Sequence, residues 1–131
     1  MGSKITEQFV PYKQAKELKE LGFKEHCLGY YEDSKIVISS VEYIESEDNF
    51  FILAPLYCQA FEWFREKYEY DVYVFPSVPE MMNKIAKIKK YSANVYHRNR
   101  NPRLWSEYYD TFQEAQLACL DKLIKLVKEK K

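Results

Sequence analysis

The sequence from Thr111 to Lys131 reads Thr-Phe-Gln-Glu-Ala-Gln-Leu-Ala-Cys-Leu-Asp-Lys-Leu-Ile-Lys-Leu-Val-Lys-Glu-Lys-Lys and contains the signals of a complete α-helix. Thr111 and Glu114 are spaced as a capping box, in which each side chain accepts a hydrogen bond from the backbone N–H of the other. Lysines gather toward the end of the stretch, where positive charge is favourable to the helix dipole. Apolar residues recur at spacings of three and four: Ala115, Cys119, Leu120, Leu123, Ile124 and Val127. We therefore predict a long C-terminal helix whose apolar face is covered by the rest of the chain.

Two further helices are predicted upstream, each with a proline at its start. Pro11 precedes an apolar repeat of helical period over residues 12–21, and Gly22 stands where a left-handed residue ends a helix. Pro55 opens a second amphipathic stretch, which ends near Tyr68. Its buried face is expected to include Trp63.

Short β-prone runs lie between these helices. Residues 27–31 and 35–39 predict a hairpin with a three-residue turn at 32–34, and residues 41–44 extend the second strand. Further strands are predicted over residues 71–75, 91–97 and 104–109, with an exposed turn over residues 98–102. The segment 77–90 has two interpretations, a short helix or a long hairpin arm. The Tyr-rich strand Tyr70–Phe75, with Phe64 before it, is expected to pack in the core, and a place at an interface is the less favoured alternative.

This order of elements predicts an α+β fold, with a small, mostly antiparallel sheet, helices packed on one face and a long C-terminal helix. The length of 131 residues is typical of one domain, and we expect residues 1–131 to form it. Residues 1–10 are expected to be a loosely ordered N-terminal arm, with a short edge segment at Ile5, Phe9 and Val10 as the alternative. Apolar residues make up 47% of the chain and charged residues 31%, values typical of a folded globular protein rather than a disordered one.

Three stretches together resemble a family of small uncharacterised proteins encoded by phages and prophages of Bacteroides-like gut bacteria. They are Tyr12-Lys13-Gln14-Ala15-Lys16-Glu17-Leu18-Lys19-Glu20-Leu21-Gly22-Phe23, Ala54-Pro55-Leu56-Tyr57-Cys58-Gln59-Ala60-Phe61-Glu62-Trp63-Phe64-Arg65-Glu66-Lys67-Tyr68, and residues 109–128. The pairing of Ala-Pro-Leu…Trp-Phe-Arg with Ala-Gln-Leu-Ala-Cys-Leu-Asp-Lys-Leu-Ile is the more specific part. The resemblance implies a phage or prophage origin and a fold that is shared within the family. It assigns a function to no residue of this chain.

The residue types do not indicate catalysis or a bound cofactor. His26 and Cys27 are neighbours in a predicted strand, so their side chains point to opposite faces and do not form a Cys–His couple. No second His or Cys stands at metal-ligand spacing, and three glycines do not make a phosphate-binding loop. The acids Glu45, Glu47 and Asp48 match no calcium loop. We expect no enzyme, no metal, no cofactor and no small-molecule ligand.

The cysteines and the hydropathy pattern predict the cellular compartment of the protein. Cys27, Cys58 and Cys119 are far apart and form no CxxC pair, and there is neither a signal peptide nor a long apolar run. These features favour a reducing cytoplasm, that of a bacterial host, without membrane association. Cys58 and Cys119 fall on predicted helix faces and are expected in the core.

Charge is segregated although 20 basic and 20 acidic residues cancel. Residues 32–71 carry ten acids and three bases, whereas residues 81–106 carry seven bases and no acid. Opposite patches on one small protein favour association with another protein or with a second copy. We therefore predict a non-enzymatic protein-interaction module that binds a host or phage protein or itself.

The alternative is nucleic-acid binding through the basic and aromatic stretch of residues 84–105. Cations there would neutralise phosphates and exposed rings would stack on unpaired bases. The neutral net charge speaks against a dedicated nucleic-acid-binding domain. The predicted contact residues for an anion or nucleic acid are Lys84, Lys87, Lys89, Lys90, Tyr96, His97, Arg98, Arg100, Arg103 and Trp105.

Overall fold

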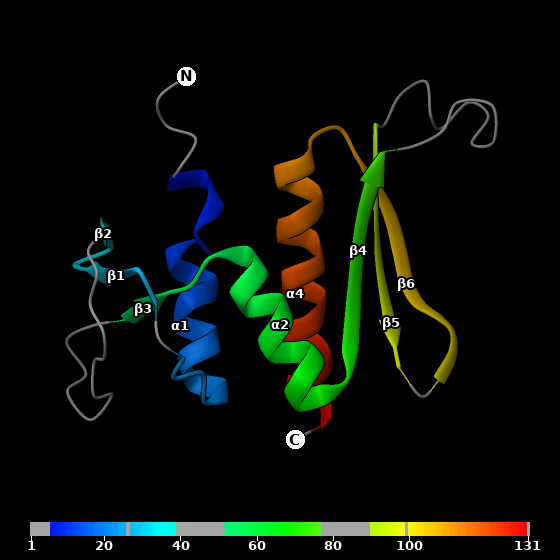
Figure 1. The fold of residues 1–131 in the computed structure, drawn as a ribbon, viewed down its shortest axis with the longest axis horizontal. Helices are drawn as coiled ribbons and strands as arrows, with labels where there is room; N and C mark the ends of the chain where they lie inside the picture. The colour runs from blue at the N-terminus through cyan, green and yellow to red at the C-terminus, as the bar shows by residue number, and fades with distance from the viewer. Residues whose placement is uncertain (1–5, 26, 39–51, 77–89, 99, 131) are drawn as a thin grey trace. The chain divides into compact units, whose positions relative to one another are not determined.

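The computed structural model describes residues 6–25, 27–38, 52–76, 90–98 and 100–130 (Figure 1). The chain divides into two compact units, Met1–Trp63 and Phe64–Lys131. Each unit contains a three-stranded antiparallel sheet. The α+β class is confirmed, with two small sheets where the sequence predicts one. The single domain stays a prediction.

The first unit combines a short sheet with a capped helix. Its elements are a 3-10 turn (Thr6–Gln8), α1 (Tyr12–Leu21), β1 (Gly29–Glu32), β2 (Lys35–Ile38), β3 (Ile52–Ala54) and the first part of α2 (Tyr57–Tyr68). The strands lie in the order β2-β1-β3. Gly22 ends α1 in a left-handed conformation with φ of 104°, as predicted, because an L side chain rarely adopts that angle.

The N-terminal segment is fixed before α1 begins. Phe9 is 4% exposed and Val10 is fully buried. The backbone N–H of Val10 donates to the carbonyl of Pro55 at 2.8 Å, and the hydroxyl of Tyr31 donates to the carbonyl of Val10 at 2.8 Å. The expectation of a loosely ordered arm therefore does not extend to these two residues.

The hairpin turn is one residue shorter than predicted. Glu32 pairs with Lys35, so only Asp33 and Ser34 form the turn. Both have positive φ, 54° and 68°, as the two central residues of a type I′ turn require. The backbone twist of such a two-residue turn matches the right-handed twist of the two strands that it joins.

The second unit packs one long helix on a sheet. It comprises the end of α2 followed by β4 (Tyr70–Pro76), β5 (Tyr91–His97), β6 (Arg100–Tyr109) and α4 (Phe112–Lys130). The strands lie in the order β4-β5-β6, and α4 runs along the sheet with its axis close to the strand direction (Figure 1).

The predicted C-terminal helix is confirmed together with its cap. The Glu114 N–H donates to Thr111 Oγ1 at 3.1 Å, and the Thr111 N–H donates to Glu114 Oε1 at 3.3 Å. The apolar stripe is buried, with no member more than 3% exposed: Ala115, Cys119, Leu120, Leu123, Ile124 and Val127. Full burial of one such aliphatic side chain contributes about 1.5–3 kcal/mol, so this stripe is the main source of stability for α4.

Two further sequence-based expectations need correction in the described residues. The last strand begins at Arg100, not Leu104, and includes Pro102. β6 is an edge strand of this sheet, where a missing N–H is tolerated on the outer side. Cys58 is exposed, because it lies about 200° around α2 from the buried Ala60. The predictions for residues 39, 41–44 and 77–89 lie outside the described residues.

Candidate interaction surface

Strand alternation gives the β4-β5-β6 sheet two different faces. The ring of Tyr91 packs edge-on against Phe112 of α4, with centroids 5.9 Å apart. Residues two apart on a strand share a face, so Ala93 and Val95 also point toward α4, and both are fully buried. The intervening residues of β5 point to the other side. With their paired neighbours they form what we call the open face: Asp71, Tyr73, Phe75, Ser92, Asn94, Tyr96, Ser106 and Tyr108. Leu104, two residues before Ser106 in β6, is included because residues two apart on a strand share a face.

Aromatic side chains stand exposed on the open face. Tyr73 is 51% exposed and Phe75 is 49% exposed, and Leu104 on β6 is 41% exposed. The rings of Tyr73 and Tyr96 are 5.6 Å apart at an interplanar angle of 79°. These values depart from the favoured interpretation, in which the strand Tyr70–Phe75 packs in the core. Trp63 and Phe64 do have the buried positions predicted for them.

Short polar side chains of the central strand lie between these larger groups. Asn94 is 1% exposed and Ser92 is 8% exposed. The Asn94 Nδ2 donates to Ser92 Oγ at 2.8 Å and to the Tyr73 carbonyl at 3.2 Å. A buried amide costs little when its donors are satisfied, so this pair forms a stable polar floor beneath the exposed rings.

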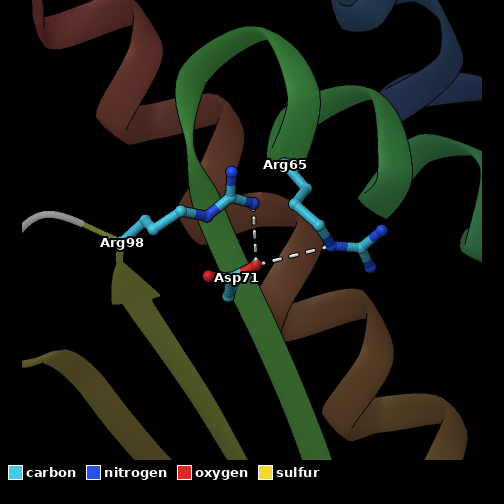
Figure 2. Close-up of polar contacts among 3 residues, drawn as sticks. All are labelled: Arg65, Asp71 and Arg98. Atoms are coloured by element: carbon cyan, nitrogen blue, oxygen red, sulfur yellow. Dashed lines mark hydrogen bonds and ion pairs between the residues drawn. The ribbon is translucent and has the colours of Figure 1, made fainter.

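Two arginines converge at one end of the open face. The Asp71 Oδ1 lies 3.4 Å from Arg65 Nε and 3.4 Å from Arg98 Nη2. Figure 2 shows the two guanidinium groups reaching this carboxylate from either side, Arg65 from α2 and Arg98 from the end of β5. The two arginine side chains are 44% and 48% exposed, and that of Asp71 is 20% exposed. The cluster therefore carries one positive charge in excess, at the surface.

The predicted contact residues are distributed over several places. Lys84, Lys87 and Lys89 lie outside the described residues, and Arg100 and Arg103 lie in β6. Lys90 is exposed immediately before β5, and its N–H donates to the Tyr109 carbonyl at 3.1 Å.

The remaining predicted residues fall on different faces. Tyr96 lies on the open face, and Arg98 reaches the cluster at its edge. His97 points the other way, with its ring 5.3 Å from that of Tyr70, and Trp105 pairs with Val95 on the face toward α4. The alternation of strands thus separates residues that are close in sequence.

Sequence analysis missed the exposed aromatic pair on β4. Tyr73 and Phe75 share strand parity with Asp71, so all three point to one side. A charged residue in that alternating set indicates the solvent side of a strand. That signal is present in the sequence. Because 17% of the residues are aromatic, however, the rings of this strand were assigned to the core.

The buried thiols are poor nucleophiles. Burial, and secondarily the charge of Glu25, raises the pKa of Cys27 from 9.0 to about 12. Burial also raises the pKa of Cys119 to about 12, against a smaller lowering effect of the Asn94 backbone. A thiol with such a pKa is protonated at neutral pH and does not attack an electrophile.

Among the described residues, no group of three or more His, Cys, Asp or Glu side chains is placed to hold a metal ion. No helix in that part of the chain is both long enough and apolar enough to cross a membrane.

Comparison with known proteins adds no assignment. The chain matches no protein-family model, no curated protein and no solved structure. The open face and the arginine cluster therefore have to be interpreted from their own geometry and charge.

Proposed function

We propose that this chain is a non-enzymatic protein-interaction module of phage or prophage origin, acting in the cytoplasm of a bacterial host. Its contact surface is the open face, and its partner is a host protein, a phage protein or a second copy. The observation that carries the proposal is the half exposure of Tyr73 and Phe75 on one side of β4. Phage origin is supported by the family resemblance of the three sequence stretches.

Exposed aromatic rings favour a protein partner for physical reasons. Burying a large ring against a partner removes apolar area from water, and aromatic residues are enriched in the energetically important centres of interfaces. The satisfied Asn94–Ser92 floor lets that area be covered without leaving a buried donor unpaired. Leu104 adds an aliphatic side chain to the same surface.

The geometry of the rings is less suited to nucleic acid. Base stacking needs rings whose faces are turned outward. Tyr73 and Tyr96 are nearly perpendicular, at 79°, so at most one of them lies flat on the sheet. This arrangement offers a contact surface for side chains rather than a row of stacking platforms.

Nucleic-acid binding is retained as the second candidate because of charge. Arg65 and Arg98 leave one positive charge in excess beside the open face, and residues 81–106 contain no acid. If this function is correct, labelled single-stranded DNA or RNA should bind at roughly 50 mM salt and dissociate steeply as salt rises. An Arg98→Gln variant should then lose affinity for every oligonucleotide.

Site-specific crosslinking tests the protein-interaction function. A benzophenone amino acid placed at Phe75 should give a discrete crosslinked product in a bacterial lysate after irradiation. The same group placed at Ile38, which is 44% exposed in the first unit, is the matched control and should not give that product. A Tyr73→Ser change should weaken the crosslink from position 75. Identical products from both positions, or none from position 75, would contradict the proposal.

A further inference from the structure

The two ends of the open face along β4 differ in chemistry. Asp71, Tyr73 and Phe75 occupy successive positions on one side of the strand. The Asp71 end carries the two arginines, and the Phe75 end carries an exposed apolar ring. At about 3.3 Å per residue, the two ends are separated by about 13 Å.

Within the cluster of Arg65, Asp71 and Arg98, two guanidinium groups share one carboxylate. Both arginines contact the same oxygen of Asp71, each at 3.4 Å. Strong charge-assisted bonds between nitrogen and a carboxylate oxygen are shorter, about 2.7–2.9 Å, and arginine engages a carboxylate best through a two-pronged contact. Among the described residues that form the open face, Asp71 alone is acidic, because Glu107 of β6 lies opposite Ala93 on the face toward α4.

From this polarity we propose that the partner presents an acidic segment in an extended conformation along β4. One carboxylate of that segment binds between Arg65 and Arg98, and an apolar side chain four residues away packs on Phe75 and Tyr73. The spacing follows from the strand period. Residues four apart in an extended segment point to the same side and span the same distance as Asp71 and Phe75, whereas residues three apart point to opposite sides. This inference rests on the proposed function and specifies its partner.

Synthetic peptides test the inference with the full-length protein. The probes are fluorescein-labelled decapeptides of Ser, Thr and Gln that contain one Glu and one Phe four residues apart, in both orders. In the matched control peptides, Gln replaces the Glu, or the spacing is three. Binding is followed by fluorescence anisotropy at roughly 50 mM salt, where surface charges are weakly screened. We expect the better four-spaced peptide to bind about tenfold more tightly than either of its controls.

Variants of the protein locate the contact. Arg98→Gln should remove most of the preference for Glu over Gln, while Lys125→Gln on the exposed side of α4 should leave it unchanged. Phe75→Ser should weaken the binding of every peptide, and Ile38→Ser should not. Circular dichroism melting curves show that each variant is folded before it is compared.

The outcomes separate this inference from the proposed function. Equal binding of Glu and Gln peptides that is still lost in Phe75→Ser would overturn the acidic partner and leave the open face as a binding surface. If no peptide binds at millimolar concentration, the inference fails, and crosslinking from position 75 decides the function independently. An oligonucleotide that displaces the peptides at lower concentration, or a dimer in sedimentation that Phe75→Ser abolishes, would also overturn the acidic segment as the occupant.

Discussion

At the scale of single residues, the open face depends on an asparagine that the solvent does not reach. Asn94 is 1% exposed, yet it lies on the face away from α4. Its amide donates to Ser92 and to the Tyr73 carbonyl, which ties the central strand to β4. Removing one partner of a buried hydrogen bond leaves the other unsatisfied, and that penalty exceeds the net contribution of an ordinary exposed contact.

Asn94→Ala should therefore lower the free energy of unfolding by about 1–3 kcal/mol, measured by urea denaturation. Ser106→Ala, at the paired position on β6, is the matched control and should change it by no more than about 0.5 kcal/mol. Equal effects of the two substitutions would show that the Asn94 network does not stabilise the sheet.

Alkaline pH should destabilise the protein through its buried thiols. The pKa values of Cys27 and Cys119 are raised from 9.0 to about 12 in the folded protein. Between these values the unfolded chain loses thiol protons that the folded chain retains, so the free energy of unfolding falls as pH rises. Below pH 9 the contribution is fully present. Burial also raises the pKa of Tyr31 and of Tyr109, which acts in the same direction.

The measurement is the urea midpoint between about pH 8 and about pH 11. Cys119→Ala should show a shallower decline with pH than the unchanged chain, whatever its stability at neutral pH, because one titrating thiol is gone. An unchanged slope in that variant would contradict the assignment of the decline to Cys119.

At the scale of elements, α4 combines a local signal with a tertiary one. Its capping box satisfies two backbone N–H groups at the surface, and its apolar stripe is buried. The first contribution depends on residues three apart in sequence. The second depends on what the rest of the chain places against the helix. The two contributions to the free energy of unfolding should differ in magnitude.

Thr111→Ala should lower the free energy of unfolding by about 1 kcal/mol, the usual effect of losing an N-cap. Leu120→Ala should lower it by about 2–5 kcal/mol, because it leaves a cavity under a fully buried position. Gln113→Ala, at an exposed position of the same first turn, is the control and should be close to neutral. Chemical denaturation of the three variants measures these losses of free energy of unfolding. A loss in Thr111→Ala as large as that in Leu120→Ala would contradict the predicted ranking.

At the scale of the whole molecule, each unit has its own sheet and its own buried side chains. Leu18 of α1 is fully buried in the first unit, and Leu123 of α4 is fully buried in the second. Contacts concentrated within units favour local opening of one unit without the other. The sequence alone, with its length of 131 residues, favours one domain.

Hydrogen exchange followed by mass spectrometry distinguishes local opening of one unit from cooperative unfolding of the whole chain. We expect Leu18→Ala to accelerate exchange mainly in α1 and β1, and Leu123→Ala to accelerate it mainly in α4 and β5. Leu28→Ser, at a position that is 50% exposed, is the control and should accelerate neither region. Equal acceleration of both units by either buried substitution would show that the chain unfolds as one cooperative domain, as its length predicts.

The elements with strong local signals were predictable from sequence. The end of α1 at Gly22 and the cap of α4 depend on neighbours within one helical turn, so their signals are complete in a short stretch. The alternation that places Asp71, Tyr73 and Phe75 on one side is equally local. The hairpin turn was only approximately predicted, because its length depends on the pairing of Glu32 with Lys35 across two strands.

The amino-acid sequence by itself determined the three described helices and most of the strands, but neither β3 nor the first residues of β6. Only the tertiary structure decided which side of the second sheet α4 covers, and it alone brought Arg65, Asp71 and Arg98 together from separate elements. The physical reason is that periodicity is a property of neighbouring residues. Coverage of a face and convergence of charges depend on contacts between residues far apart in the chain, and no short pattern encodes them.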